Sequence, residues 1–184
     1  MGESEKILPQ SQIYRAIIMI FVTVGTDHHP FERLIKEVDR LKEKEFIQED
    51  VFIQKGSASY TPRSCHYNNI IPFTKLLDKL HKARIAITHG GPGSIMPLLY
   101  QGKIPVVVPR QKKFGEAVDD HQVSFARKLE REGRILAVFN IEDLKTKIEN
   151  YNTLAQNLKM KSPKEQITRF TNYLEKISLK LIKR

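Results

Sequence analysis

The residues of this chain whose types and spacing best suit chemistry form one short run, His89-Gly-Gly-Pro-Gly-Ser94. An apolar, β-type stretch precedes the run, and a helix-compatible stretch follows it. Glycine allows a positive φ and lets an anion approach without a Cβ in the way, and the first amides of a helix are unpaired at the positive end of its dipole. The run therefore indicates a phosphate site, with Ser94 as N-cap or hydroxyl donor. A tight turn in which glycine serves only geometry fits the same short pattern.

A second candidate segment is Gly25-Thr26-Asp27-His28-His29, which offers a backbone turn, a hydroxyl and two imidazoles. Adjacent histidines with no third ligand at suitable spacing make a poor metal site, so the sequence predicts no bound metal. Exposed loop histidines and hydrogen-bonding histidines both remain open as interpretations.

A third candidate segment follows a predicted strand and begins at Pro109-Arg110-Gln111-Lys112-Lys113. Basic side chains at that place suit a diphosphate, because they neutralise its charge while donating hydrogen bonds. A solvated basic loop fits Lys112 and Lys113 equally well and fits Arg110 less well.

The end of that segment, Asp119-Asp120-His121-Gln122, has two interpretations. Either aspartate can cap the helix that follows, or His121 and Gln122 can present hydrogen-bonding groups to ligand hydroxyls; spacing alone favours the cap. The adjacent aspartates are not the Asp-x-Asp of metal-dependent sugar-nucleotide enzymes. The sequence has no Gly-x-x-x-x-Gly-Lys phosphate loop and no Gly-x-Ser-x-Gly elbow, so it supports neither a nucleoside triphosphatase nor an α/β-hydrolase.

Strand-like and helix-like segments alternate along the chain, which predicts an α/β fold with a doubly wound, mostly parallel, Rossmann-like sheet. The predicted strands are 17–23, 51–54, 83–88, 105–108 and 135–139, with a short extended piece at 69–72. The predicted helices are 31–44, 76–80, 94–100, 121–132 and 141–151. Both glycine loops follow strands and precede helices, so we expect them at the carboxyl edge of the sheet, where such folds bind ligands.

A chain of 184 residues with 40% hydrophobic and 28% charged residues fits one globular α/β domain. We expect that domain at 16–160, between a polar leader at 1–15 and a basic amphipathic helix at 161–184. Cys65 is the only cysteine, which excludes an intramolecular disulfide and a cysteine-based zinc site. No apolar run approaches the ~20 residues of a membrane-spanning helix.

Positive charge is concentrated in the C-terminal segment, within a chain of formal net charge +10. Residues 160–184 contain seven basic and two acidic residues. Such an excess favours anionic membranes, nucleic acid or an acidic partner, and the lack of interleaved aromatic residues makes nucleic acid the weakest of these. The apolar stripe from Ile167 to Leu181 fits packing on the chain's own domain and docking to a partner or membrane equally well.

Taken in order, these segments resemble the C-terminal half of family 28 glycosyltransferases. The resemblance rests on the His89–Ser94 run, the strand at 106–108, the run Pro-Arg-Gln-Lys-Lys-Phe-Gly-Glu at 109–116 and Asp-His-Gln at 120–122. The stretch Phe-Val-Thr-Val-Gly-Thr at 21–26 looks like the first strand and loop of that half. Within the family, the chain looks most like the split enzymes, either bacterial exopolysaccharide transferases or the eukaryotic transferase that adds the second N-acetylglucosamine to a dolichol-linked sugar.

The resemblance implies half of a GT-B fold and a UDP-sugar donor. The residues implied at the donor diphosphate are Gly25, Thr26, His89, Gly90, Gly91, Pro92, Gly93, Ser94 and Arg110. The residues implied at the donor sugar or ribose are Glu116, His121 and Gln122. Many relatives carry a ribose-binding carboxylate at the position that Pro97 occupies here, so we expect Glu116 to take that role.

The function that the resemblance implies is the donor-binding, catalytic subunit of an inverting transferase that moves a hexosyl group from a UDP-sugar to a lipid-linked saccharide. A membrane-anchored partner subunit would supply the acceptor half and hold the chain at the cytoplasmic membrane face, and homo-oligomers are compatible with this arrangement. His28 is the local candidate for the base that deprotonates the acceptor, unless the partner carries that base. We expect no cofactor, no metal and no nucleic acid. The alternative is a non-catalytic, nucleotide-sugar-binding regulatory module.

Overall fold

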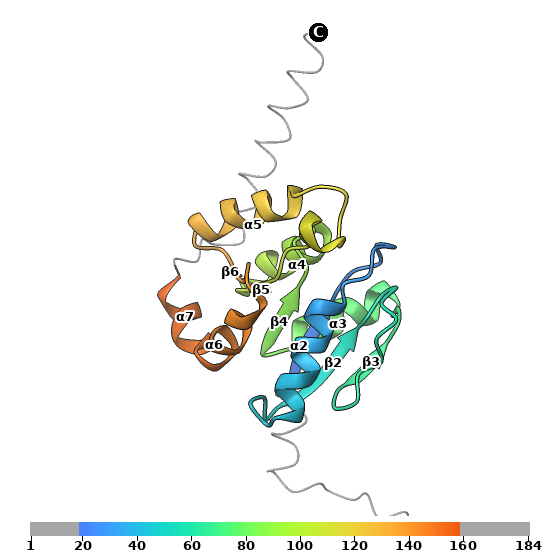
Figure 1. The fold of residues 1–184 in the computed structure, drawn as a ribbon. Coiled ribbons are helices and arrows are strands. Elements are labelled where there is room, and N and C mark those ends of the chain that lie inside the picture. Colours follow the sequence, from blue (N-terminus) through green and yellow to red (C-terminus); the bar gives the residue numbers. More distant parts are fainter. Residues whose placement is uncertain (1–18, 159–184) are drawn as a thin grey trace, which may run out of the picture.

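Six parallel strands lie in the order β3-β2-β1-β4-β5-β6 in the structure, a computed structural model that describes residues 19–158 (Figure 1). The strands are β1 (Met19–Thr23), β2 (Asp50–Gln54), β3 (His66–Asn68), β4 (Ile85–Thr88), β5 (Val106–Val107) and β6 (Leu136–Ala137). This sheet confirms the predicted α/β, doubly wound, Rossmann-like class. The leader at 1–15 and the C-terminal helix at 161–184 fall outside the described residues.

Helices cover both faces of the sheet. One face carries α2 (Glu32–Glu43), the 3-10 turn η2 (Ile141–Asp143), α6 (Leu144–Glu149) and α7 (Tyr151–Asn157), and the other carries α3 (Phe73–Lys82), α4 (Pro92–Tyr100) and α5 (His121–Arg131). Successive side chains of β1 pack on opposite faces of the sheet. Ile20 and Val22 join the apolar cluster of α2, whereas Phe21 joins that of α3 and α4. No helix within residues 19–158 is long and apolar enough to cross a bilayer.

Four predicted elements differ from the observed ones. The third strand forms at His66–Asn68 rather than at 69–72, because these residues pair with β2 and Pro72 already precedes α3. The predicted helix at 141–151 is divided into η2, α6 and α7, with a break at Asn150. The predicted strands at 105–108 and 135–139 shorten to two residues each.

The loops that carry the candidate residues lie at one edge of the sheet, as predicted. Thr23 at the end of β1 lies opposite Gln54 of β2 and Thr88 of β4, and Thr88 lies opposite Val107 of β5. Because the strands run in the same direction, the segments after these residues leave the sheet on the same side. We call this side the carboxyl edge.

Candidate functional site

The imidazole of His89 lies between the two glycine loops. Its Nδ1 accepts a hydrogen bond from the Gly91 amide at 3.0 Å, and its Nε2 lies 2.9 Å from Ser94 Oγ. Since Nδ1 accepts, the ring proton belongs on Nε2 and is donated to the serine. A Cβ at Gly25 would lie 2.6 Å from Nε2, and one at Gly91 would lie 2.2 Å from Cε1. Both glycines therefore make room for this ring, and Gly25 also has a φ of +78°.

His89 is neutral in this position. Burial and the nearby positive charge of Arg110 lower the pKa of the imidazole to about 4. A neutral ring brings no positive charge to a diphosphate. In this structure the ring holds the loop between β4 and α4 in place through its hydrogen bonds to Gly91 and Ser94.

Most amides of this loop are already used within the protein. Gly90 N donates to Gln122 Oε1, Gly91 N donates to His89, and Ser94 N donates to the Gly91 carbonyl. Pro92 has no N–H. The amide of Gly93 has no hydrogen-bond partner among residues 19–158, and a Cβ at Gly93 would meet no atom within 4 Å. The open anion-binding group of the loop is thus Gly93 N–H, in the first turn of α4.

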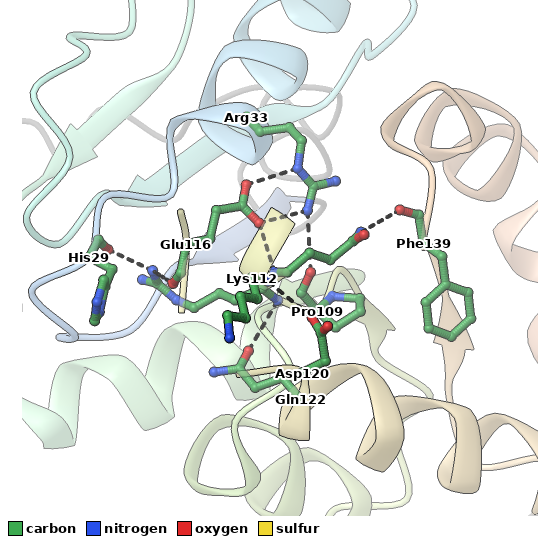
Figure 2. A network of polar contacts seen from close by, with 10 residues as sticks. His29, Arg33, Pro109, Lys112, Glu116, Asp120, Gln122 and Phe139 are labelled. Atoms are coloured by element: carbon green, nitrogen blue, oxygen red, sulfur yellow. Dashed lines mark hydrogen bonds and ion pairs between the residues drawn. The ribbon is translucent and has the colours of Figure 1, made fainter. Parts of the chain in front are cut away.

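Arg110 lies behind the loops rather than at the surface, with 1% of its area exposed. Its Nη1 donates to the carbonyls of His29 at 2.6 Å and Glu116 at 3.0 Å (Figure 2). Its Nη2 donates to the carbonyl of Val24 at 2.8 Å. These bonds fix the segment after β1 against the segment after β5. The diphosphate contact expected of Arg110 stays a prediction, and it would require some of these bonds to be exchanged.

Glu116 is buried in the same network. Its two oxygens accept from Arg33 Nε at 2.9 Å and Arg33 Nη2 at 3.0 Å, and Oε2 also accepts from the Gln111 amide at 3.0 Å (Figure 2). Arg33 Nη2 also donates to the carbonyl of Pro109. In this structure Glu116 therefore belongs to the framework of the β5–α5 segment, and a ribose-binding role stays a prediction.

Gln122 and His121, at the start of α5, differ in exposure and contacts. Gln122 Oε1 accepts from the amides of Gly90 at 2.9 Å and Arg110 at 3.2 Å, so it joins the β4–α4 loop to the segment after β5. The His121 side chain is 89% exposed, and its Nδ1 lies 2.6 Å from Asp119 Oδ1. The same carboxylate accepts the His121 amide at 2.9 Å. The N-cap residue of α5 is Asp120, whose Oδ1 accepts from the Lys112 amide and makes no capping hydrogen bond. The expected contacts of the His121 and Gln122 side chains with donor sugar hydroxyls stay predictions.

The segment after β1 brings three metal-ligating side chains together. Single ligand atoms of Asp27, His28 and His29 all lie within 4.8 Å of one another. His29 Nδ1 lies 2.7 Å from Asp27 Oδ1, whereas His28 Nδ1 lies 3.8 Å from it and the His28 side chain is 85% exposed. Asp27 accepts hydrogen bonds from the amide and the imidazole of His29. Both lower the pKa of the Asp27 carboxyl, and the bond from the amide has the larger effect. The catalytic role of His28 stays a prediction.

Sequence reasoning missed two residues at this edge, Arg33 and Gln54. Three buried side-chain atoms in the described part of the chain have no hydrogen-bond partner: Arg33 Nη1, Gln54 Oε1 and Arg110 Nε. Arg33 is one of several charged residues in the helix predicted at 31–44, and Gln54 ends a short predicted strand. Neither has a sequence signal of its own, because their importance comes from segments distant in the chain.

The parallel sheet and the glycine loops at its carboxyl edge define an α/β protein of the Rossmann-like class. Residues 19–177 match the glycosyltransferase family 28 C-terminal domain, and the chain belongs to this family. It is similar to the UDP-N-acetylglucosamine transferase subunit ALG13 of Yarrowia lipolytica (strain CLIB 122 / E 150), with 28% identity over 136 residues. That alignment covers 67% of this chain and 66% of the relative.

Solved glycosyltransferases share the fold at low identity. The glycotransferase of kitacinnamycin has a TM-score of 0.54 and 18% identity, with 76% of this chain and 36% of that one covered. Spinosyn forosaminyltransferase SpnP has a TM-score of 0.53 and 16% identity, with 95% and 48% covered. MurG of Acinetobacter baumannii has a TM-score of 0.50 and 15% identity, with 85% and 50% covered. These structures have the GT-B fold, and the chain spans half of their length or less.

Proposed function

We propose that this chain is the donor-binding, catalytic subunit of an inverting glycosyltransferase that moves a hexosyl group from a UDP-sugar to a lipid-linked saccharide. The observation that carries the proposal is the unpaired amide of Gly93, open to solvent at the start of α4 and flanked by loops that His89 holds in place. A helix N-terminus with a free amide is a binding group for phosphate. Membership of the family and similarity to the UDP-N-acetylglucosamine transferase subunit ALG13 support a UDP-sugar as the ligand.

The proposed chemistry depends on charge that develops on the leaving group. As the bond between the sugar C1 and the diphosphate oxygen breaks, negative charge builds on the UDP phosphates. Donors that bind this charge more strongly than they bind the ground state lower the barrier. Gly93 N–H and the dipole of α4 are the groups in this chain that would act in this way, with the exposed Thr26 hydroxyl on the same edge.

The acceptor hydroxyl also needs a base. His28 is our candidate on this chain, because it is exposed on the carboxyl edge, and a base on the partner is the alternative. The partner itself is proposed because the similar ALG13 protein is named as a subunit. A membrane-anchored partner would bring the chain to the cytoplasmic membrane face.

Charge reversal at Gly93 tests the donor site. We expect UDP and UDP-sugars to raise the melting temperature of the wild-type chain, with and without EDTA. Gly93→Glu should weaken UDP binding by roughly tenfold or more through repulsion, while the helix gains from an acidic residue in its first turn. Gly93→Gln is the uncharged control of similar size and should bind UDP more tightly than Gly93→Glu. No response of the wild-type chain to UDP or any UDP-sugar would refute the donor site.

Transfer assays test catalysis separately. The chain is combined with candidate acceptor-binding subunits, and transfer from each UDP-sugar to a lipid-linked saccharide is measured. UDP-sugar binding without transfer in any combination would favour the regulatory module instead.

A further inference from the structure

Two large apolar side chains are exposed on the segment between β5 and α5, at the carboxyl edge of the sheet. Phe114 is 51% exposed, and Val118 is 71% exposed, the highest value among the large apolar residues at 19–158. Single exposed apolar residues are common on protein surfaces. Two of them on one short segment indicate a contact surface if the fold holds the segment in place and if its surroundings favour one kind of partner.

Hydrogen bonds hold the segment in a defined shape. The Phe114 amide donates to the Gln111 carbonyl at 3.1 Å, and the Gly115 amide donates to the Lys112 carbonyl at 2.9 Å. These bonds close the 3-10 turn η1 (Lys112–Phe114), and Gly115 continues it with a φ of +69° that glycine adopts without strain. The fold therefore presents the Phe114 ring on a built turn.

Cations surround the Phe114 ring. Lys113 Nζ lies 4.7 Å from the ring centroid, and Arg33 Cζ lies 4.8 Å from it. Arg33 is paired with Glu116. Lys112 and Lys113 are exposed, and neither forms an ion pair within the part of the chain that the structure describes. Two ammonium groups thus stand free beside an exposed aromatic ring.

The exposed acidic residues of the segment lie at its other end. Asp119 and Asp120 follow Val118 in the chain, whereas the two lysines precede the aromatic ring. Asp119 Oδ1 lies 2.6 Å from His121 Nδ1, and Asp120 Oδ1 accepts from the Lys112 amide at 3.0 Å. Both carboxylates therefore have partners within the chain, and the lysines are open to an external anion.

The segment lies beside the candidate donor loops. Gln122 Oε1 accepts from the Arg110 amide, at the start of the segment, and from the Gly90 amide in the β4–α4 loop. An acceptor saccharide has to reach the donor at this edge. Because the proposed acceptor is linked to a lipid, its saccharide stays near a membrane surface, so the edge that carries the segment has to face that surface.

We propose that the segment at 112–118 docks on a phospholipid membrane. Phe114 and Val118 enter the boundary between headgroups and acyl chains, where exposed aromatic and aliphatic side chains leave water. Lys112 and Lys113 bind lipid phosphates. Two side chains offer far less than the ~800 Å² per partner of a standard protein interface, whereas a membrane takes up single side chains. The inference rests on the proposed function, because the lipid-linked acceptor sets the orientation.

Tryptophan placed in the segment tests the inference, because the chain has no tryptophan of its own. Full-length Phe114→Trp is mixed with vesicles of phosphatidylcholine and phosphatidylglycerol. We expect its emission to shift to the blue and to be quenched by brominated acyl chains. Tyr100→Trp is the matched control, because Tyr100 is 59% exposed at the end of α4, which leads back to the start of β5 at the opposite edge. We expect it to show neither effect.

Vesicle sedimentation of the full chain measures the affinity. Phe114→Ser should bind the mixed vesicles roughly tenfold more weakly than wild type, and Tyr100→Ser should bind them like wild type. Lys113→Gln should weaken binding to vesicles that contain phosphatidylglycerol and leave binding to pure phosphatidylcholine unchanged. Every variant should keep the melting-temperature response to UDP, which reports the donor site separately.

Unshifted emission of Phe114→Trp, or equal vesicle affinities of Phe114→Ser and Tyr100→Ser, would overturn the membrane role of the segment and leave the donor site standing. Membrane binding through the basic residues at 160–184 alone would give that result, and so would a protein partner that covers Phe114. A wild-type chain with no response to UDP would instead remove the proposed function, and with it the lipid-linked acceptor on which the orientation rests.

Discussion

Arg33 and Glu116 form a two-bond ion pair, with Nε to Oε1 at 2.9 Å and Nη2 to Oε2 at 3.0 Å, although they lie 83 residues apart in the chain. The pair joins α2 to the segment between β5 and α5. Both side chains are largely buried, at 14% and 4% exposure. The pair therefore fixes the segment that leads to Gln122 and, through Gln122, the loop that begins α4.

Removing one partner of this pair should destabilise the fold strongly. Arg33→Met or Glu116→Gln leaves the other group buried without its partner, and such changes cost about 3–5 kcal/mol. Urea unfolding measures the loss. The double variant Arg33→Met/Glu116→Met should recover much of the stability, because it leaves neither charge unpaired.

The pair of Arg40 and Glu37 is the control, because its arginine side chain is 43% exposed while its glutamate is 13% exposed. It has similar geometry, with Nη2 to Oε1 at 2.7 Å, but its arginine lies at the surface of α2, in contact with water. Water screens such a pair, so Arg40→Met should cost less than about 1 kcal/mol. Equal losses for Arg33→Met and Arg40→Met would contradict the structural role given to the buried pair.

Acid should destabilise the fold through His89. Its imidazole has a pKa of about 4 when folded, against an ordinary value of 6.5. Between these values the unfolded chain binds a proton that the folded chain does not. The contribution of His89 to the free energy of unfolding is therefore complete above pH 6.5 and is lost as the pH drops toward 4. The loss from this group approaches about 3 kcal/mol.

Unfolding of wild type and His89→Gln at pH 7.5, 6.0 and 5.0 isolates that loss. The wild-type free energy of unfolding should fall over this range more than that of the variant. Carboxyl groups with lowered pKa values, such as Asp27 and Asp39, lose their contribution at lower pH and so affect this range little. Parallel pH curves for the two proteins would show that the ring is not buried as described.

The strands and the position of the glycine loops could be predicted because they depend on local pattern. The β-branched run that ends in Thr23 reads as a buried strand, and β-type residues before His89 do the same for β4. Because both predicted strands belong to a parallel sheet, the loops that follow them are predicted at the same edge. The family resemblance added the expectation of a donor site there.

The roles of individual polar residues could not be predicted in this way. Arg110 and Glu116 follow a strand, as ligand-binding residues do, and their sequence context does not show that they are buried and bonded to the chain. Their partners, Arg33, Val24 and His29, come from a segment before β2. Only the folded chain brings these groups together. From charge and position in the sequence alone, Arg110 and Glu116 were therefore expected to bind ligand rather than other parts of the chain.

Alanine at Gly91 and at Gly93 should have opposite effects. A Cβ at Gly91 would lie 2.2 Å from His89 Cε1, so Gly91→Ala must displace the ring and should cost about 1–3 kcal/mol by overpacking. A Cβ at Gly93 meets no atom within 4 Å, so Gly93→Ala should be neutral or slightly stabilising in the first turn of a helix. Thermal unfolding distinguishes them. His89→Ala combined with Gly91→Ala should cost less than the sum of the single changes, because the clash then has no partner.

Gln122 offers a test that separates loop positioning from sugar binding. Gln122→Ala removes the acceptor for two buried amides, those of Gly90 and Arg110, and should cost about 1–3 kcal/mol of stability. Gln122→Glu keeps an acceptor for both amides but loses the side-chain N–H groups, so it should unfold close to wild type. If those N–H groups bind the donor sugar, Gln122→Glu will remain folded but will bind a UDP-sugar no more tightly than UDP. If both variants are equally destabilised, the acceptor is not what holds the loops together, because the carboxylate of Gln122→Glu would supply it.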